Sequence, residues 1–379
     1  MLLTNFVYFD NGRPIKDRAV LVEEGIITAV VSQYEKAGKI ENFDLKGNYL
    51  VPGFVDLQVN GGADVFFSNN ITEEAIGQIY ADHLRRGTTC ILPTLISSPL
   101  PDILKAIEAV KTYMRHKPGV AGLHLEGPFL NLSKKGAHNP AYIRAPDDGE
   151  LMQILDAGEG VIKMITVAPE LFTDEQIAHI LSKDIIISAG HSNITSQQAG
   201  KYFSKGVACV THLFNAMSQF GSREPGLAGA ALDADVYAGI IVDGGHCDYA
   251  AVRIAHRLKA GRLFLVSDST FISAKELEMN GIKFIPTKTG FVNAEGNLAG
   301  SNITMADAVK NSVNKVGIPL AGAIKMAAEI PLEIIGLSES RGKIKPGFIA
   351  DLVVLSKKDL SVDRVIKDGK CIARYAPNG

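Results

Sequence analysis

The chain has 379 residues, 46% of them hydrophobic and 21% charged, which is typical of a folded globular protein and excludes a disordered or fibrous one. The net charge of −2 gives no indication of the basic surface by which proteins bind nucleic acid or an anionic membrane. The four cysteines show no C-x-x-C spacing, and no apolar stretch reaches the ~18 residues of a membrane span. We therefore expect a cytoplasmic protein that binds neither nucleic acid nor a membrane.

Residues 1–49 contain only short β-type segments, such as "NFVYFDNGRPI", in which Asp10-Asn11-Gly12 predicts a turn. The closing segment "GKIKPGFIADLVVLSKKDLSVDRVIKDGKCIARY" has the same character, with a second turn predicted at Lys367-Asp368-Gly369. We expect residues 1–49 and 344–379 to form one small β-sandwich.

Eight apolar runs follow the first β-rich segment, at 51–59, 88–96, 119–127, 162–170, 184–191, 208–215, 238–246 and 262–269. Helical segments lie between several of them, with capping residues at Thr72, Thr173 and Asp248. Continuous apolar strands alternating with helices predict an α/β fold, a TIM-like (β/α)8 barrel, over residues 50–343. Residues 296–317 and 321–337 predict a loop and two helices.

Polar residues end most of these runs. Active sites of such barrels occupy the C-terminal ends of the strands. Residues of this kind end six of the runs: Gln58, Asn60, Glu126, His191, His212, His246 and Asp268.

Glu126, His191 and His212 are carboxylate and imidazole groups on three separate strands. They are the ligand types that hold a borderline divalent metal with one position open for water. Any one of these histidines alone is better explained as a buried polar residue satisfied by its neighbours. Three of them at strand ends on one face favour a metal site.

Asp268 ends the apolar run "FLVSDS", and it is our candidate general base and acid; the alternative is an Asp that caps the following loop. His138 lies in the loop "KKGAHNPAYI", from which it can polarise a substrate carbonyl. We expect His124 to pack inside the barrel. His83, His116, His179 and His256 fall in helical segments and are expected on the surface.

No G-x-x-x-x-G-K-[ST] loop is present, so any phosphate is held in another way. Arg223 lies in a loop rich in Gly, Ser and Pro, and backbone N–H groups near Asn215 and Ala216 precede it. His246 adds a further donor. The alternative for Arg223 is a solvated loop charge.

Several segments together resemble the N-acetylglucosamine-6-phosphate deacetylases, a family of the amidohydrolase superfamily. They include "PGFVDLQVNG", "HLEGPFLNLSKKGAHNP", "SAGHS", "THLFNAMS", "GLAGAAL", "DGGHCDY", "LVSDS", "GNLAGS" and "GKIKPGFIADLVVL". The resemblance spans nearly the whole chain. It implies metal-dependent hydrolysis of N-acetyl-D-glucosamine 6-phosphate to D-glucosamine 6-phosphate and acetate, in amino-sugar catabolism and cell-wall amino-sugar recycling.

Family members with Gln-x-Asn in place of His-x-His on the first strand work with a single divalent ion. The resemblance therefore implies one ion per subunit, Zn²⁺ before Fe²⁺, Mn²⁺ or Co²⁺, held by Glu126, His191 and His212. It also implies a homodimer and a catalytic Asp268, with His138 assisting. The expected substrate-binding residues are Gln58, Asn60, Ala137, His138, Asn215, Ala216, Arg223, His246, Leu298, Ala299 and Gly300.

The segment "STFISAKELEMNG" after Asp268 departs from the Ala/Pro/Gly-rich stretch of relatives. Two other functions stay open at this point. One is an amidohydrolase acting on a cyclic amide, against which Gln58 and Asn60 argue because a binuclear site favours His-x-His. The other is a non-catalytic barrel scaffold, against which the joint presence of the Glu, the two His and Asp268 argues.

Overall fold

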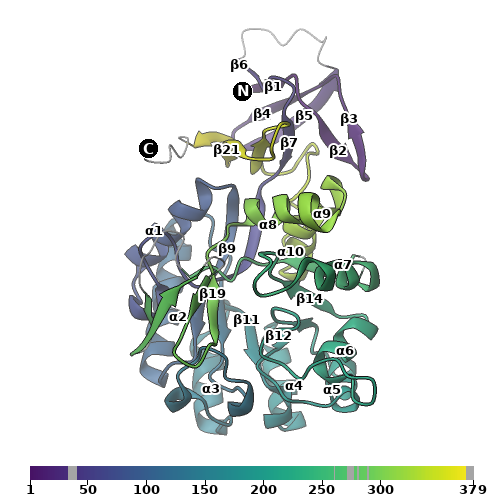
Figure 1. Ribbon diagram of the computed structural model, residues 1–379. Helices are drawn as coiled ribbons and strands as arrows, with labels where there is room; N and C mark the ends of the chain where they lie inside the picture. Colours follow the sequence, from purple (N-terminus) through teal and green to yellow (C-terminus); the bar gives the residue numbers. More distant parts are fainter. Residues whose placement is uncertain (33–40, 260, 271–276, 280, 288–289, 373–379) are drawn as a thin grey trace. The chain divides into compact units, whose positions relative to one another are not determined.

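The computed structural model describes residues 1–32, 41–259, 261–270, 277–279, 281–287 and 290–372 (Figure 1). The chain divides into two compact units. One unit contains residues 1–56, 81–90 and 305–379, and the other contains residues 57–80 and 91–304. Both units are therefore built from more than one segment of the chain, and the first combines the two chain ends.

An eight-stranded sheet carries the barrel, with its strands in chain order and parallel pairing from β9 to β15. The strands are β8 (Phe54–Val59), β9 (Thr88–Ile96), β10 (Leu123–Glu126), β11 (Ile162–Val167), β12 (Ile186–Ala189), β13 (Cys209–Val210), β14 (Tyr237–Ile240) and β15 (Leu263–Leu265). Each coincides with one of the eight apolar runs, so the predicted (β/α)8 barrel is confirmed. Nearly every strand residue is buried, as expected for strands covered on both faces.

The barrel closes at a seam between its first and last strands. Val59 and Ser269 form a parallel bridge. The backbone amide of Asp268 donates to the Gln58 carbonyl at 3.0 Å, and the amide of Asn60 donates to the Ser269 carbonyl at 2.9 Å. The seam therefore places Gln58, Asn60 and Asp268 together at one rim of the barrel.

Helices surround these strands (Figure 1). They are α1 (Glu73–Leu84), α2 (Leu100–His116), α3 (Asp148–Ala157), α4 (Asp174–Ser182), α5 (Ser196–Ser204), α6 (Gly226–Asp233) and α7 (Tyr249–Leu258). Thr72, Thr173 and Asp248 accept hydrogen bonds from the first turns of α1, α4 and α7, which confirms the three predicted start signals. No helix in the described part of the chain combines the length and apolarity that crossing a membrane requires.

The prediction that His83 lies on the surface is wrong, because this residue of α1 is fully buried. An amphipathic helix also has a covered face, and the spacing of a single His does not show on which face it lies.

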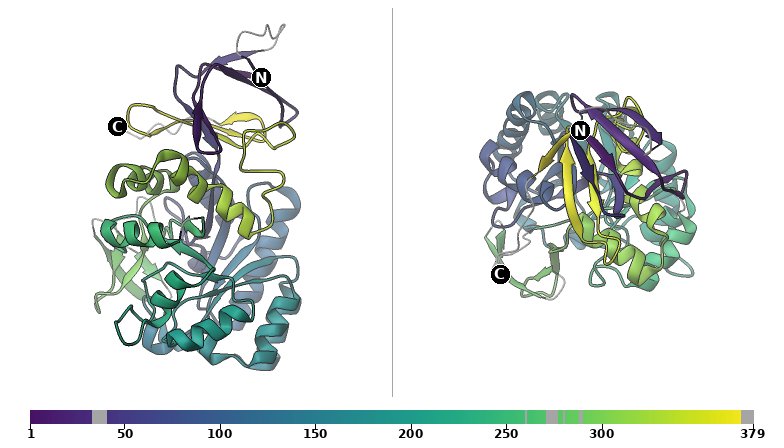
Figure 2. Two further views of the ribbon diagram at one scale, coloured as in Figure 1. Left: turned by 90° about the vertical axis from the view of Figure 1, so that its right-hand side faces the viewer. Right: turned by 90° about the horizontal axis from the view of Figure 1, so that it is seen from above.

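Two sheets from the chain ends pack on a common apolar core that includes Leu3, Val20, Ile27, Leu50 and Leu352. Their strand orders are β5-β4-β1-β6 and β22-β21-β20-β7. The purple and yellow strands lie side by side in both views of Figure 2. This arrangement confirms the predicted small sandwich. The strands are β1 (Leu2–Thr4), β4 (Arg18–Glu23), β5 (Ile26–Ser32), β6 (Asn42–Asp44), β7 (Tyr49–Pro52), β20 (Leu352–Leu355), β21 (Val362–Lys367) and β22 (Lys370–Ile372).

Both predicted hairpin turns are present. Strands β2 (Tyr8–Asp10) and β3 (Arg13–Ile15) are joined by Asn11 and Gly12, with φ of 46° and 78°. Asp368 and Gly369 join β21 to β22 with φ of 47° and 73°. Two successive left-handed residues are the backbone that Asn-Gly and Asp-Gly turns favour.

The first apolar run is divided between two sheets at Gly53. Residues 49–52 form β7, which pairs with β20, and only β8 enters the barrel. A Cβ atom at Gly53 would lie 2.2 Å from Oγ1 of Thr89. The close approach of these two backbone segments therefore requires glycine.

Beyond β15 the chain adds an antiparallel sheet of β16 (Leu277–Met279), β17 (Ile282–Pro286), β18 (Gly290–Val292) and β19 (Leu298–Ser301). Part of the loop predicted within 296–337 is instead strand β19, because the backbone amide of Ser301 donates to the Asp268 carbonyl and Ser269 forms a bridge with Ser301. Most of the atypical segment after Asp268 lies outside the described residues. Helices α9 (Leu320–Ala327) and α10 (Glu329–Ile334) confirm the two predicted helices, and α8 (Met305–Asn311) precedes them.

Candidate active site

A cavity of about 360 Å³ lies at the C-terminal ends of the barrel strands and beside β19. It brings together most of the residues that the sequence indicates: Asn60, Glu126, Ala137, His138, His191, His212, Asn215, Ala216, His246, Asp268, Leu298, Ala299 and Gly300. All of them belong to the unit formed by residues 57–80 and 91–304.

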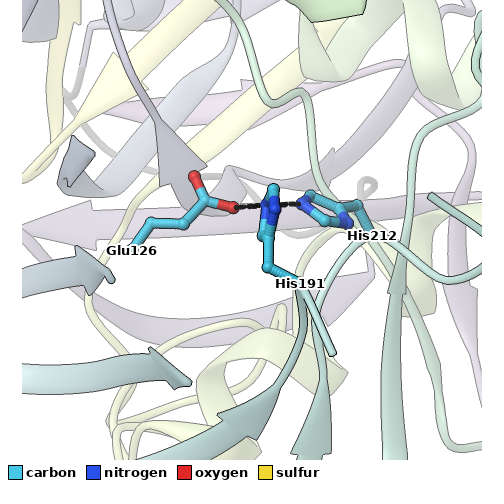
Figure 3. A group of neighbouring side chains, drawn as sticks. All are labelled: Glu126, His191 and His212. Atoms are coloured by element: carbon cyan, nitrogen blue, oxygen red, sulfur yellow. Dashed lines mark hydrogen bonds and ion pairs between the residues drawn. The ribbon is translucent and has the colours of Figure 1, made fainter. Parts of the chain in front are cut away.

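Glu126, His191 and His212 line this cavity, and their side chains point toward one another (Figure 3). Oε1 of Glu126 lies 3.3 Å from Nε2 of His191 and 3.0 Å from Nε2 of His212, and the two ring nitrogens are 3.1 Å apart. Around a tetrahedral zinc ion with bonds of about 2.0 Å, neighbouring ligand atoms are about 3.3 Å apart. The three atoms therefore have the spacing and the chemistry of a ligand set for a small divalent cation.

Charge within the cluster supports the same interpretation. Burial would raise the pKa of Glu126, but hydrogen bonds from His191 and His212 hold it well below its ordinary value. Burial would lower the pKa of His212, but its hydrogen bond to Glu126 raises it. Three converging lone pairs require positive charge between them, which either protons or a divalent cation supplies.

Two contacts orient these ligands from outside the cluster. Nδ1 of His191 donates to the Lys134 carbonyl at 2.9 Å, which leaves Nε2 as the free lone pair that faces the cavity. Nε2 of Gln58 donates to Oε1 of Glu126 at 3.0 Å. The Gln58 side chain thus contacts a ligand from behind, and it does not line the cavity.

Asp268 and Asn60 meet across the barrel seam. Nδ2 of Asn60 donates to Oδ1 of Asp268 at 2.7 Å. Burial and the nearby Glu126 carboxylate raise the pKa of Asp268 to about 7, so this carboxyl group can exchange a proton near neutral pH. Oδ1 of Asn60 is buried and has no hydrogen-bond partner within the described part of the chain.

His138 is a neutral hydrogen-bond donor in the wall of the cavity. Burial and the neighbouring His191 lower its pKa to about 3. The backbone amide of Ser97 donates to Nδ1 of His138 at 3.3 Å, and the Ser97 hydroxyl lies 2.8 Å from the same nitrogen. An amide can only donate, so Nδ1 is the acceptor and the proton resides on Nε2.

His246 is held by Asp243, a residue that the sequence reasoning did not single out. Oδ2 of Asp243 lies 2.6 Å from Nδ1 of His246, and Oδ1 accepts the backbone amides of Gly245 and His246 at 2.8 Å each. Burial would raise the pKa of Asp243, but His246 lowers it below the ordinary value. The signal was available, because Asp243 follows the apolar residues "AGII" of the seventh run.

Arg223 is not brought to the cavity. Its side chain is exposed on the loop between β13 and α6, and it is not among the residues that line the site in this chain. Phe220 on the same loop is 64% exposed. A single chain therefore leaves this predicted phosphate contact outside the site.

His124 packs inside the barrel as predicted. Nδ1 lies 2.8 Å from the Leu57 carbonyl, and Nε2 lies 2.8 Å from the Thr166 hydroxyl. Both ring nitrogens are thus engaged by other groups in the interior of the barrel.

Residues 49–372 match the amidohydrolase family. An N-acetylglucosamine-6-phosphate deacetylase from Haemophilus influenzae is 39% identical over 93% of this chain and 94% of its own length. An N-acetylgalactosamine-6-phosphate deacetylase from a Shewanella species is 35% identical, over 89% and 87% of the two chains. The crystal structure of the N-acetylglucosamine-6-phosphate deacetylase from Pasteurella multocida superposes with a TM-score of 0.95 at 34% identity, covering 98% of this chain and 99% of that one.

Proposed function

The chain belongs to the amidohydrolase family, and we propose that it hydrolyses the acetamido group of N-acetyl-D-glucosamine 6-phosphate, giving acetate and D-glucosamine 6-phosphate. The observation that carries this function is the cluster of Glu126, His191 and His212 at the base of a cavity that Asp268 also lines. The protein is thus a hydrolase of amino-sugar metabolism.

The metal that suits this site best is Zn²⁺, bound once per chain by Glu126, His191 and His212. One carboxylate and two imidazoles form the kind of three-residue set that catalytic zinc uses, and Fe²⁺, Mn²⁺ and Co²⁺ accept the same ligands. A divalent ion at such a site acts as a Lewis acid, lowering the pKa of water and polarising a carbonyl.

Two residues of this chain carry the proton and the developing charge. The Asp268 carboxylate takes a proton from the attacking water and passes it to the nitrogen of the departing amine, so that glucosamine leaves neutral. His138 donates from Nε2 to the acetamido oxygen as that atom becomes negatively charged. A neutral imidazole suits this role because it does not repel the cation beside it.

The phosphate end of the substrate is assigned to His246 and the backbone near Asn215 and Ala216, all of which line the cavity. Arg223 contributes from a second copy of the chain, because in its own chain it lies on an exposed loop beside the exposed Phe220. This assignment requires a homodimer. A cytoplasmic location is also part of the proposal.

The test is acetate release by the purified, metal-loaded protein. We compare N-acetylglucosamine 6-phosphate, N-acetylgalactosamine 6-phosphate, unphosphorylated N-acetylglucosamine, and dihydroorotate as a cyclic amide. Of these four compounds, N-acetylglucosamine 6-phosphate should have the highest kcat/KM. N-acetylgalactosamine 6-phosphate is included because one relative is an N-acetylgalactosamine-6-phosphate deacetylase. Turnover of dihydroorotate alone would overturn the proposal.

The alternative hypothesis of a non-catalytic scaffold is tested by measuring metal content and the effect of added metal on activity. It requires that the protein bind no divalent ion and that added zinc, iron or manganese restore no activity. The spacing of the three candidate ligand atoms argues against the scaffold. Burying a carboxylate and two imidazole nitrogens that converge on one point is costly unless they bind a cation.

A further inference from the structure

Glu170 lies just outside the cavity, in the turn η4 (Pro169–Leu171) that follows β11. Its carboxylate accepts three hydrogen bonds. Oε1 accepts from Nδ2 of Asn131 and from the backbone amide of Asn193, each at 2.9 Å, and Oε2 accepts from the Ser192 hydroxyl at 2.6 Å. Charge-assisted hydrogen bonds of this kind are among the stronger ones in proteins.

The three donors lie on two segments that contact the ligand His191. Ser192 and Asn193 directly follow His191 in the chain. Asn131 belongs to the loop after β10, and its backbone amide donates to the His191 carbonyl at 2.9 Å. Glu170 therefore ties together the segment that carries this ligand and the loop that lies against it.

The same loop also fixes the imidazole of His191. Nδ1 of His191 donates to the Lys134 carbonyl, and Lys134 donates its own amide to the Asn131 carbonyl at 2.8 Å. Oδ1 of Asn131 accepts from the amide and hydroxyl of Ser133, at 3.0 and 2.7 Å. The hydrogen bond from Asn131 to Glu170 thus anchors the turn that orients the ring.

The backbone of His191 requires such support. It has a φ of +48°, in the left-handed region that non-glycine residues rarely adopt. Strained residues of this type persist only where surrounding contacts hold them. Relaxation of φ at His191 would rotate its side chain away from Glu126 and His212.

We propose that Glu170 is a positioning residue for the metal, holding His191 in ligand geometry through Ser192, Asn193 and Asn131. The inference rests on the metal site of the proposed function. Glu170 does not line the cavity, so it acts on the ion through His191 and leaves substrate contacts unchanged. Removal of an outer partner of a metal ligand typically weakens metal binding by about 10- to 100-fold.

The test measures metal affinity directly. Zinc is removed from the wild-type enzyme and from Glu170→Gln, and the dissociation constant for added zinc is measured by competition with a chelator. We expect about a 10- to 100-fold weaker zinc affinity in Glu170→Gln, because the amide offers one acceptor where the carboxylate offered two. With excess zinc, KM for N-acetylglucosamine 6-phosphate should stay within about threefold of wild type, as expected for a residue that makes no substrate contact.

Cobalt(II) provides a second readout, since its visible absorption reports coordination geometry. The cobalt spectrum of Glu170→Gln should differ from that of the wild-type protein. Glu175→Gln is the matched control, because this exposed residue of α4 undergoes the same chemical change nearby. Its zinc affinity and cobalt spectrum should equal those of the wild-type protein.

Ser192→Ala keeps the experiment decisive if Glu170→Gln fails to fold. It deletes the 2.6 Å hydrogen bond to Glu170, together with the longer one of 3.3 Å that the Ser192 hydroxyl accepts from the Ile194 amide, and we expect a smaller but measurable loss of zinc affinity. In the double variant the two losses should be less than additive, because both changes remove the same bond. Unchanged zinc affinity and cobalt spectra in both folded variants would overturn the role of Glu170. If the wild-type protein bound no metal, the proposed function itself would fail.

Discussion

Asn60 and Asp268, which lie 208 positions apart in the sequence, share a hydrogen bond of 2.7 Å at the barrel seam. The amide of Asn60 holds one carboxylate oxygen of Asp268 in place. Asn60 lines the cavity, and its own Oδ1 is buried and has no hydrogen-bond partner in the described structure. The Gln-x-Asn pair thus occupies the place of a His-x-His pair, with Gln58 contacting the candidate ligand Glu126 and Asn60 contacting Asp268.

Asp268→Asn should lower kcat by about 10²-fold or more while metal content stays near one ion per chain. The amide cannot take the proton of water, whereas its oxygen can still accept the hydrogen bond from Asn60. Steady-state kinetics and metal analysis on the same sample measure both effects. Asp233→Asn, on an exposed residue of α6, is the control. Near-normal kcat in the Asp268→Asn variant would remove Asp268 from the mechanism.

His191→Ala or His212→Ala should abolish both metal binding and activity, because two protein ligands hold a divalent ion too weakly at a site built for three. The wild-type protein should contain one ion per chain, with Gln58 and Asn60 outside its ligand set. Elemental analysis after gel filtration gives the stoichiometry. Two ions per chain bridged near Gln58 would contradict this arrangement.

Arg223→Ala should lower kcat/KM for the 6-phosphate sugar by roughly 2 to 4 kcal/mol in transition-state free energy, and barely change turnover of the unphosphorylated sugar. Arg223→Lys should retain only part of the wild-type kcat/KM for the phosphorylated sugar, since an ammonium group cannot make the bidentate contact with phosphate. An equal loss on both substrates would mean a structural role.

Mixing Arg223→Ala chains with Asp268→Asn chains tests whether Arg223 acts across a dimer. Each variant alone is nearly inactive on the phosphorylated sugar. Random pairing gives hybrid dimers with one intact site, about a quarter of all sites. Activity should recover toward that fraction after subunit exchange. No recovery would place Arg223 in the site of its own chain.

His138→Ala should lower kcat by about 10²- to 10³-fold, the usual effect of removing an oxyanion donor. Because the pKa of His138 is about 3, the ring is neutral at all working pH values, and a bound cation would lower its pKa further. We expect the change in kcat between pH 5 and 8 to follow the titration of Asp268. The midpoint of that change should therefore be the same in the residual activity of His138→Ala as in the wild-type protein. Loss of that change in kcat would show that His138 itself titrates there.

His124→Gln should reduce the acid sensitivity of the metal-free protein. Burial lowers the pKa of His124 to about 4, against about 6.5 in an unfolded chain. Between these values the unfolded chain binds the extra proton, so stability falls as the pH falls, by about 3 kcal/mol at pH 4. The free energy of unfolding is measured with urea at pH 7, 6 and 5 in the presence of a chelator. It should decline less with falling pH in the His124→Gln variant than in the wild-type protein. An identical decline would contradict the assignment.

The barrel strands and the cluster of candidate metal ligands could be predicted because they share one signal. Glu126, His191 and His212 each end an apolar run, and a parallel barrel gathers the ends of its strands at one rim. Glu170 ends the fourth run in the same way, so the rule that selected Glu126 could have selected it. What the sequence does not reveal is that its carboxylate turns away from the cavity toward Ser192 and Asn131.

Other features depend on contacts that no local pattern encodes. Strand β19 forms because Ser301 pairs with the backbone at Asp268 and Ser269, whereas "NLAGS" alone has the composition of a loop. The division of the first run at Gly53 depends on Thr89, which approaches from another strand. Arg223 could be assigned to phosphate by its charge, but its distance from the cavity of its own chain could not be foreseen.

On the roles proposed for its residues, the chain order separates metal binding from catalysis during synthesis. All three metal ligands lie between residues 126 and 212, so a chain that has emerged from the ribosome only through residue 260 already carries them. It lacks Asp268, and its first barrel strand has an unpaired edge. Such a chain has the means to acquire its ion but not to turn over substrate. On the proposed mechanism, products truncated before Asp268 therefore do not deacetylate the phosphorylated sugar.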